Sequence, residues 1–120
     1  MGIFHKDVCF PRWLQGSIPT GAKKLFFTHH AREQLFEKNS VNLPNEMVVK
    51  MTAFDIIEVT TAGHTITKMV ARSKGVYADE SNLCLAMIPG NEKGTWVVKT
   101  AWLNHKDDTH RTLDISRFTK

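Results

Sequence analysis

The chain has 120 residues, the usual length of one domain, and can bury a core without disulfides or bound metals. Its 42% hydrophobic and 23% charged residues exclude a disordered or a fibrous protein. The formal net charge of +4 favours an anionic partner, yet the basic residues form no dense block like that of a nucleic-acid-binding tail.

Cysteine usage and hydropathy indicate a cytoplasmic protein. Cys9 and Cys84 lie far apart and fit no zinc-binding spacing, which argues against a zinc site and a disulfide framework. Residues 1–11 lack the apolar run of a signal peptide, and no stretch approaches the roughly 20 residues that span a bilayer. We therefore expect the chain to reside in a reducing compartment.

The first part of the chain is predicted to be an irregular arm followed by a helix. Residues 1–24 mix isolated apolar side chains with turn formers, a pattern that predicts no regular element. Thr28 is a suitable N-cap for a helix over residues 29–38. Its buried stripe would comprise Ala31, Leu35 and Phe36.

A second helix is predicted to end near Phe54. Asn42 would cap it, and Pro44 would stand in its first turn. The apolar side chains that recur at core spacing are Met47, Val48 and Met51.

From Asp55 onward the pattern changes to four strands. Runs rich in β-branched side chains flank a turn at Gly63 and predict a hairpin, and two further runs flank the turn at residues 89–94. The predicted strands cover residues 55–60, 65–72, 83–88 and 95–104.

The predicted fold class is therefore α+β, with one or two N-terminal helices packed on a four-stranded antiparallel meander. The whole chain, 1–120, would form a single domain. It would divide into an arm (1–24), a helical part (25–54), the sheet (55–104) and a tail (105–120).

Strict alternation along two of the strands would gather polar residues on sheet faces. In the second strand one face would carry Ile66, Lys68, Val70 and Arg72. In the last strand one face would carry Trp96, Val98, Thr100, Trp102 and Asn104.

Three segments hold the residue types that metal-free RNA cleavage requires. The reaction needs a base for the 2′-hydroxyl proton, an acid for the leaving oxygen, and cations or hydrogen-bond donors around the phosphate. In a fold of helices on a meander these segments can converge. The candidates are His29, His30 and Arg32 in the helix, Lys68 and Arg72 in the second strand, and Thr100, Asn104 and His110 in or after the last strand.

Each candidate also has a structural interpretation. A His at a helix start is commonly packed or solvated, and Lys68 and Arg72 could simply lie along an exposed strand. Trp102 could stack on a nucleobase, but with its neighbours at alternate positions it also fits the core face of a sheet.

The remaining histidines indicate no metal centre. The segment 104–110 is dense in potential ligands but matches no recognised ligand spacing, so we interpret it as a solvated turn and expect no metal. His5 and His64 are interpreted as surface residues.

The order of these motifs resembles a known superfamily. The helix opening at His30 to Gln34, followed by a meander whose last strand runs from Trp96 to Trp102, is similar to the small RNase superfamily that unites RelE-like toxins with barnase and colicin nuclease domains. The likeness covers residues 25–110, and the Trp-Leu-Asn end of the last strand departs from the RelE-like pattern.

The resemblance implies a toxin or phage-encoded effector that cleaves RNA without a metal or cofactor. Attack by the 2′-hydroxyl would leave a 2′,3′-cyclic phosphate. His30 would serve as base or acid, while Lys68 and Arg72 would stabilise the phosphate. Thr100, Asn104 and His110 would hold or protonate the substrate. Arg32, Lys99 and Trp102 are further candidates for substrate binding.

Two other classes of function fit the same sequence. A catalytically inactive phage or host-interaction protein could inhibit a protein partner through an exposed face containing Trp13 or Trp102. A nucleic-acid-binding module could use the positive charge without cleaving, and its RNA affinity would then depend strongly on salt.

Overall fold

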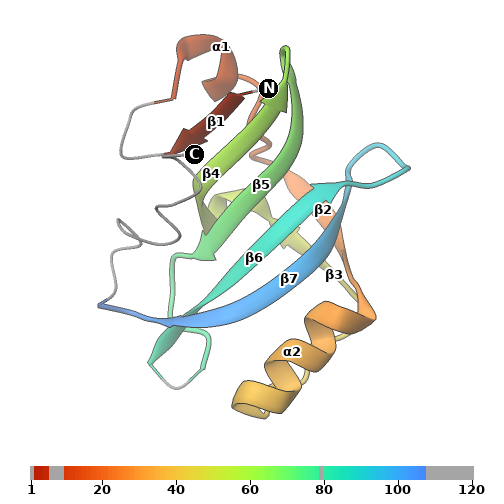
Figure 1. Ribbon diagram of the computed structural model, residues 1–120, viewed down its shortest axis with the longest axis vertical. Helices are drawn as coiled ribbons and strands as arrows, with labels where there is room; N and C mark the ends of the chain where they lie inside the picture. The colour runs from red at the N-terminus through yellow and green to blue at the C-terminus, as the bar shows by residue number, and fades with distance from the viewer. Residues whose placement is uncertain (1, 6–9, 79, 108–120) are drawn as a thin grey trace.

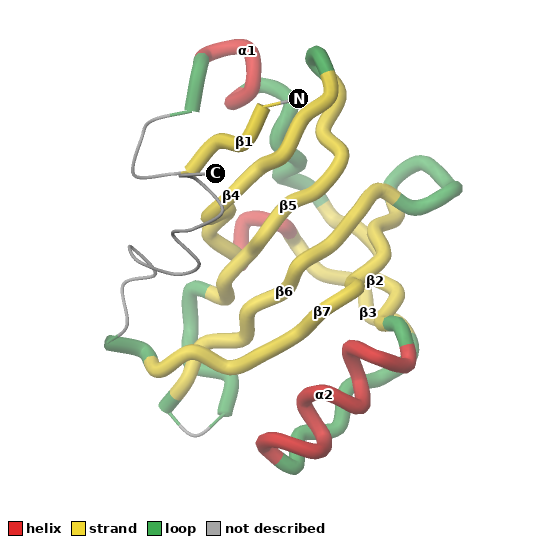
Figure 2. The backbone as a smooth tube through the Cα atoms, viewed as in Figure 1, coloured by secondary structure: helices red, strands yellow, loops and turns green. Residues whose placement is uncertain are grey.

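The computed structural model describes residues 2–5, 10–78 and 80–107, and most of these residues lie in strands (Figures 1 and 2). In chain order the elements are β1 (Gly2–His5), α1 (Arg12–Gln15), β2 (Ala22–Phe27), α2 (His29–Asn39), β3 (Glu46–Lys50), the 3-10 turn η2 (Met51–Ala53), β4 (Phe54–Ala62), β5 (Thr65–Ser73), β6 (Ser81–Pro89) and β7 (Thr95–His105).

A seven-stranded mixed sheet, in the order β1-β4-β5-β6-β7-β2-β3, replaces the predicted four-stranded antiparallel meander. The four predicted strands do pair in sequence order as β4 to β7. β2 then adds to the far side of β7 as a parallel neighbour, which makes the sheet mixed. The predicted fold class is therefore wrong, because three short N-terminal strands extend the sheet at both of its edges.

The predicted second helix is also wrong, since its residues form strand β3 and the turn η2. Met47 and Val49 alternate toward the core cluster while Val48 faces solvent, which is the two-residue period of a strand. The adjacent β-branched pair, Val48 and Val49, favours this extended backbone.

The predicted N-terminal arm contains regular elements. β1 pairs with β4 along residues 2–5, and one helical turn, α1, follows Pro11. Trp13 of α1 stacks on His64 in the β4–β5 turn at 4.4 Å between ring centroids. Elements this short carry too few residues to show a period in the sequence.

The predicted first helix is confirmed as α2. The Thr28 side chain accepts a hydrogen bond from the Ala31 N–H at 3.1 Å, as expected of an N-cap. Ser40, with a left-handed φ of 56°, ends the helix. Ala31 and Leu35 are buried, whereas Phe36, predicted to join them, is 55% exposed.

The short link between β3 and β4 forces the sheet to curl. Five strand spacings separate these two strands in the sheet order, or roughly 24 Å across a flat sheet. The three residues of η2 span no more than about 14 Å. The two ends of the sheet are therefore drawn toward each other. The helices α1 and α2 lie at opposite ends of the molecule (Figure 1).

Three β-bulges follow the same curvature. At each bulge two consecutive residues stand between two residues whose side chains pack in the main core. The two residues in the middle therefore both lie on the other face of the sheet, which we call the outer face. An extra residue lengthens the outer face and bends the sheet around the core. The residue pairs are Ile57 and Glu58, Thr67 and Lys68, and Lys99 and Thr100.

The main core fills the inner face of this curled sheet. It joins residues of the sheet to one side of α2 and to Leu14 of α1. A second cluster lies on the outer face, where Trp102 packs against Ile57, Val70 and Ala86. No helix in the described ranges is long and apolar enough to cross a membrane.

Replacing Leu85 with Ala tests the position of the core. Leu85 is fully buried on β6, so its truncation should lower the free energy of unfolding by about 2–5 kcal/mol in urea titrations followed by circular dichroism. The control Val76→Ala removes a side chain that is 56% exposed and should cost less than about 0.5 kcal/mol. Equal losses for both variants would contradict this core.

Candidate functional site

The outer face of β5 and β7 gathers several of the residues predicted to act on substrate. Cross-strand pairs join Arg72 to Cys84 and Cys84 to Trp102, so one strand separates the arginine from the tryptophan. Their backbones are thus roughly 10 Å apart. The predicted residues on this face are Lys68, Arg72, Thr100, Trp102 and Asn104.

The bulges correct the predicted sheet faces. Trp96 and Val98 belong to the inner core, so they do not share a face with Thr100 as strict alternation predicted. The bulge instead places exposed Lys99 beside Thr100. Ile66 packs with the inner core for the same reason, while Lys68 lies on the outer face.

Arg72 braces three strands from a buried position. Its Nε and Nη2 donate to Oδ1 of Asn82 at 3.0 and 2.7 Å, and Nη2 also donates to the His105 carbonyl at 2.8 Å. The residue is 8% exposed, which is unlike the solvated strand position considered from the sequence. The Arg72 guanidinium thus donates hydrogen bonds to both β6 and β7, and it holds the ends of these two strands together.

A buried carboxylate, Glu58, lies on the same face and was not among the predicted site residues. It is 5% exposed and pairs with Val70 on β5 and with His5 on β1. Lys68 is its diagonal neighbour on β5, at a spacing that long side chains can bridge. The sequence signal was a charged residue inside the apolar run of residues 56–59.

His5 differs from its predicted surface position, because it is 9% exposed. It ends β1 directly opposite Glu58. The prediction rested on an irregular arm, and the pairing of β1 with β4 removes that premise.

Asn104 contributes a buried donor at the open end of β7. Its partner across the strands is Asn82, the acceptor for Arg72. The Asn104 Nδ2 atom is buried and finds no hydrogen-bond acceptor among the described residues. An unsatisfied buried donor is costly, and no described residue offsets this cost.

Two hydrogen bonds fix α2 against the edge of β7. The Thr28 N–H donates to the Val98 carbonyl at 3.2 Å, and the Ala101 N–H donates to Oε1 of Gln34 at 3.3 Å. His30 precedes Gln34 by one helical turn and therefore shares its flank of the helix. His30 is exposed on this flank, and the stretch of β7 between the two hydrogen bonds contains Lys99 and Thr100.

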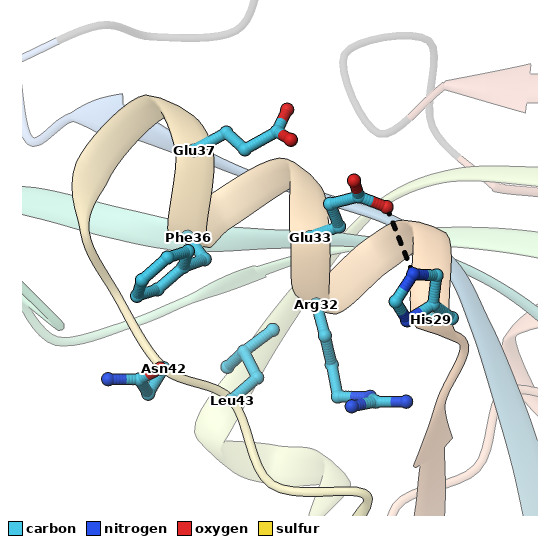
Figure 3. A pocket seen from close by; sticks show the side chains of 7 residues that line it. All are labelled: His29, Arg32, Glu33, Phe36, Glu37, Asn42 and Leu43. Atoms are coloured by element: carbon cyan, nitrogen blue, oxygen red, sulfur yellow. Dashed lines mark ion pairs between the residues drawn. The ribbon is translucent and has the colours of Figure 1, made fainter.

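The other flank of α2 lines a shallow pocket of about 370 Å³ (Figure 3). His29 Nε2 lies 3.1 Å from a carboxylate oxygen of Glu33, and Arg32 donates from Nε to the Phe27 carbonyl at 3.4 Å. Both residues line this pocket with Phe36 and Leu43. The structure thus separates Arg32 from His30, although both were predicted to serve one site.

The segment that was rich in potential metal ligands is described only as far as residue 107. His105 Nδ1 lies 3.6 Å from a carboxylate oxygen of Asp107. In the described ranges no three His, Cys, Asp or Glu side chains gather as metal ligands would. His110 lies outside the described residues, as does Cys9.

Fold and site together define a curled mixed-sheet protein whose outer face carries polar side chains around the second hydrophobic cluster. The helix α2 is bound to the edge of strand β7. Comparison with protein-family models, with curated proteins and with solved structures found no match. The resemblance to the small RNase superfamily therefore stays a prediction.

A double-mutant cycle tests the Arg72 brace. Arg72→Met and Asn82→Ala should each destabilise the fold, and the coupling energy between them should be about 1.5–3 kcal/mol, since a charged donor is involved. Urea unfolding of the four proteins gives this coupling. Additive losses would mean that the two side chains act independently.

Proposed function

We propose that the chain is a metal-independent endoribonuclease whose site lies where α2 meets the outer face of β7. The observation that supports the proposal is the attachment of α2 to β7 through Thr28 and Gln34, on either side of Lys99 and Thr100 in β7, with His30 one helical turn before Gln34. These groups are an acid–base side chain, a cation and a hydroxyl donor, which are the parts that phosphate-ester cleavage requires.

Each step of the reaction has a candidate group. His30 takes the proton of the RNA 2′-hydroxyl while the 2′-oxygen bonds to phosphorus, and the bond from phosphorus to the 5′-oxygen breaks. A protonated group then supplies a proton to that oxygen, and the ends are a 2′,3′-cyclic phosphate and a 5′-hydroxyl. His110 was predicted to share this acid–base work, and it lies outside the described residues.

Cations and donors surround the proposed phosphate position. Lys99 is adjacent to Thr100, while the Lys68 backbone is about 12 Å from Thr100 by strand geometry, a gap that its long side chain shortens. Asn104 keeps its predicted role in holding the substrate, which requires its buried amide to turn outward on binding. Arg72 holds the strands that carry these groups, so we assign it a positioning role.

Trp102 is the proposed base-stacking residue, and it is only half-buried beside Val70 and Ala86. We place the reaction on cytoplasmic RNA, in keeping with the positive net charge of the chain.

The inactive protein-binding alternative has less support at the residues predicted for it. Trp13 stacks on His64 and meets Phe4 edge to face, and Trp102 packs in the second core cluster. Neither tryptophan is among the large apolar side chains that are exposed in the described ranges. A docking face built on them would have to break these contacts.

The test is cleavage of total RNA and of a labelled oligonucleotide in EDTA. The wild-type chain should produce cyclic-phosphate ends, and His30→Ala should reduce the rate at least about 100-fold through loss of acid–base catalysis. The rate comes from initial product formation, and the ends are identified by their resistance to phosphatase until acid treatment.

The matched control is His29→Ala, because His29 neighbours His30 in sequence but lies on the flank that faces the Glu33 pocket. Its cleavage rate should stay within about threefold of wild type. Intact RNA with wild-type protein would refute the ribonuclease and favour the protein-binding alternative. Equal losses in the two variants would refute the position of the site.

A further inference from the structure

Strand β3 is the last strand of the sheet, so no strand among the described residues pairs with its outer side. The Phe27 N–H donates to the Asn45 carbonyl, and the Met51 N–H donates to the Gly21 carbonyl, in register with the β2–β3 pairs. Because hydrogen-bonded pairs alternate in an antiparallel ladder, Met47 and Val49 bond toward β2. The N–H and C=O groups of Glu46 and Val48, and the N–H of Lys50, therefore point away from the sheet, while the Lys50 carbonyl caps the turn η2.

The side chains at these outward positions are exposed and include an unusual apolar one. Val48 is 68% exposed, the largest value among the large hydrophobic side chains described. Glu46 and Lys50 flank it at the same face of the strand. A single exposed apolar residue is common, but Val48 lies beside an apolar groove that extends the exposed surface along this edge.

We propose that β3 pairs antiparallel with β3 of a second copy of this chain, about a two-fold axis at Val48. In this register Val48 lies opposite Val48 of the partner subunit, and both residues exchange their outward hydrogen bonds. Glu46 then lies opposite Lys50 of the partner subunit, and Lys50 opposite the partner's Glu46. The charges of the strand Glu-Met-Val-Val-Lys are thus complementary to their own copy.

The same pairing covers an apolar groove beside the edge. The groove has a volume of about 410 Å³, and its walls include Met47, Val49, Val76 and Tyr77. Val76 and Tyr77 are 56% and 42% exposed. Directly paired residues share a sheet face, so Met47 and Val49 of the partner subunit would fall on the groove side.

Charge reversal at the two ends of β3 tests this pairing. The association is measured by sedimentation equilibrium at protein concentrations up to about 1 mM, which detects dissociation constants as weak as about 1 mM. The wild-type chain should form a dimer. Glu46→Lys and Lys50→Glu each place like charges opposite each other twice and should raise the dissociation constant about tenfold or more. The double variant, with both charges exchanged, should return toward the wild-type constant.

Mixing the two single variants separates pairing from folding. In a mixed dimer both charge pairs become attractive again, so the mixture should associate more tightly than either variant alone. The control Glu92→Lys makes the same change of charge in the exposed β6–β7 turn and should leave the constant unchanged. Circular dichroism checks that all variants fold.

Three results would overturn the proposal. They are a wild-type chain that stays monomeric at the highest concentration, a dissociation constant that ignores both charge reversals, and a mixture that associates no better than its components. Association with another protein but not with itself would assign β3 to a different partner and would equally overturn self-pairing.

Discussion

The three residues Met51, Thr52 and Ala53 constrain the whole sheet, because they join its last strand to its second. Met51 is buried and its N–H is bonded to Gly21 at the start of β2, while the Ala53 carbonyl accepts from Lys74 at the end of β5. This short link thus contacts both ends of a folded-over sheet. Because the sheet is curled, its inner face encloses the main core. Each bulge adds one residue to the outer face, which is the longer side of the curl.

The parts of the fold that the sequence predicts are those whose signals are local. Thr28 caps a helix through an atom three residues away, and β4 and β5 meet across a turn at Gly63, which adopts a left-handed φ of 61°. By contrast, β2 finds its partner β7 from the far end of the chain. A pairing between such distant segments has no local period or turn residue to reveal it.

β3 shows how two patterns can coincide. Met47, Val48 and Met51 recur at helical spacing, yet Met47, Val49 and Met51 recur at strand spacing in the same segment. The paired β-branched residues favoured the strand, and packing of Met47 and Val49 toward the core decided it. Apolar spacing alone could not separate these two structures in so short a segment.

For the candidate site, the sequence indicated which residue types could act there better than it indicated the sheet face on which each residue lies. The sequence placed Lys68 on one face of its strand and Thr100 on one face of the last strand, but it assigned Trp96 and Val98 to the face of Thr100 as well. A bulge resets the alternation without any marker such as glycine, since Lys99 supplies the extra residue here. Burial of Arg72 and Glu58 depends on strands from both halves of the chain, so it was outside the reach of local patterns.

The parallel pairing of β2 with β7 also determines when this protein can fold during its synthesis. Leu25 and Phe27 are buried next to strand β7, which leaves the ribosome about 70 residues later. The Ala101 N–H, which donates to Gln34, belongs to the same late strand. The nascent segment that contains β2 therefore lacks its partner until β7 has been synthesised. Long-range pairing of this kind slows folding, so the apolar residues of the unfinished chain stay exposed for longer.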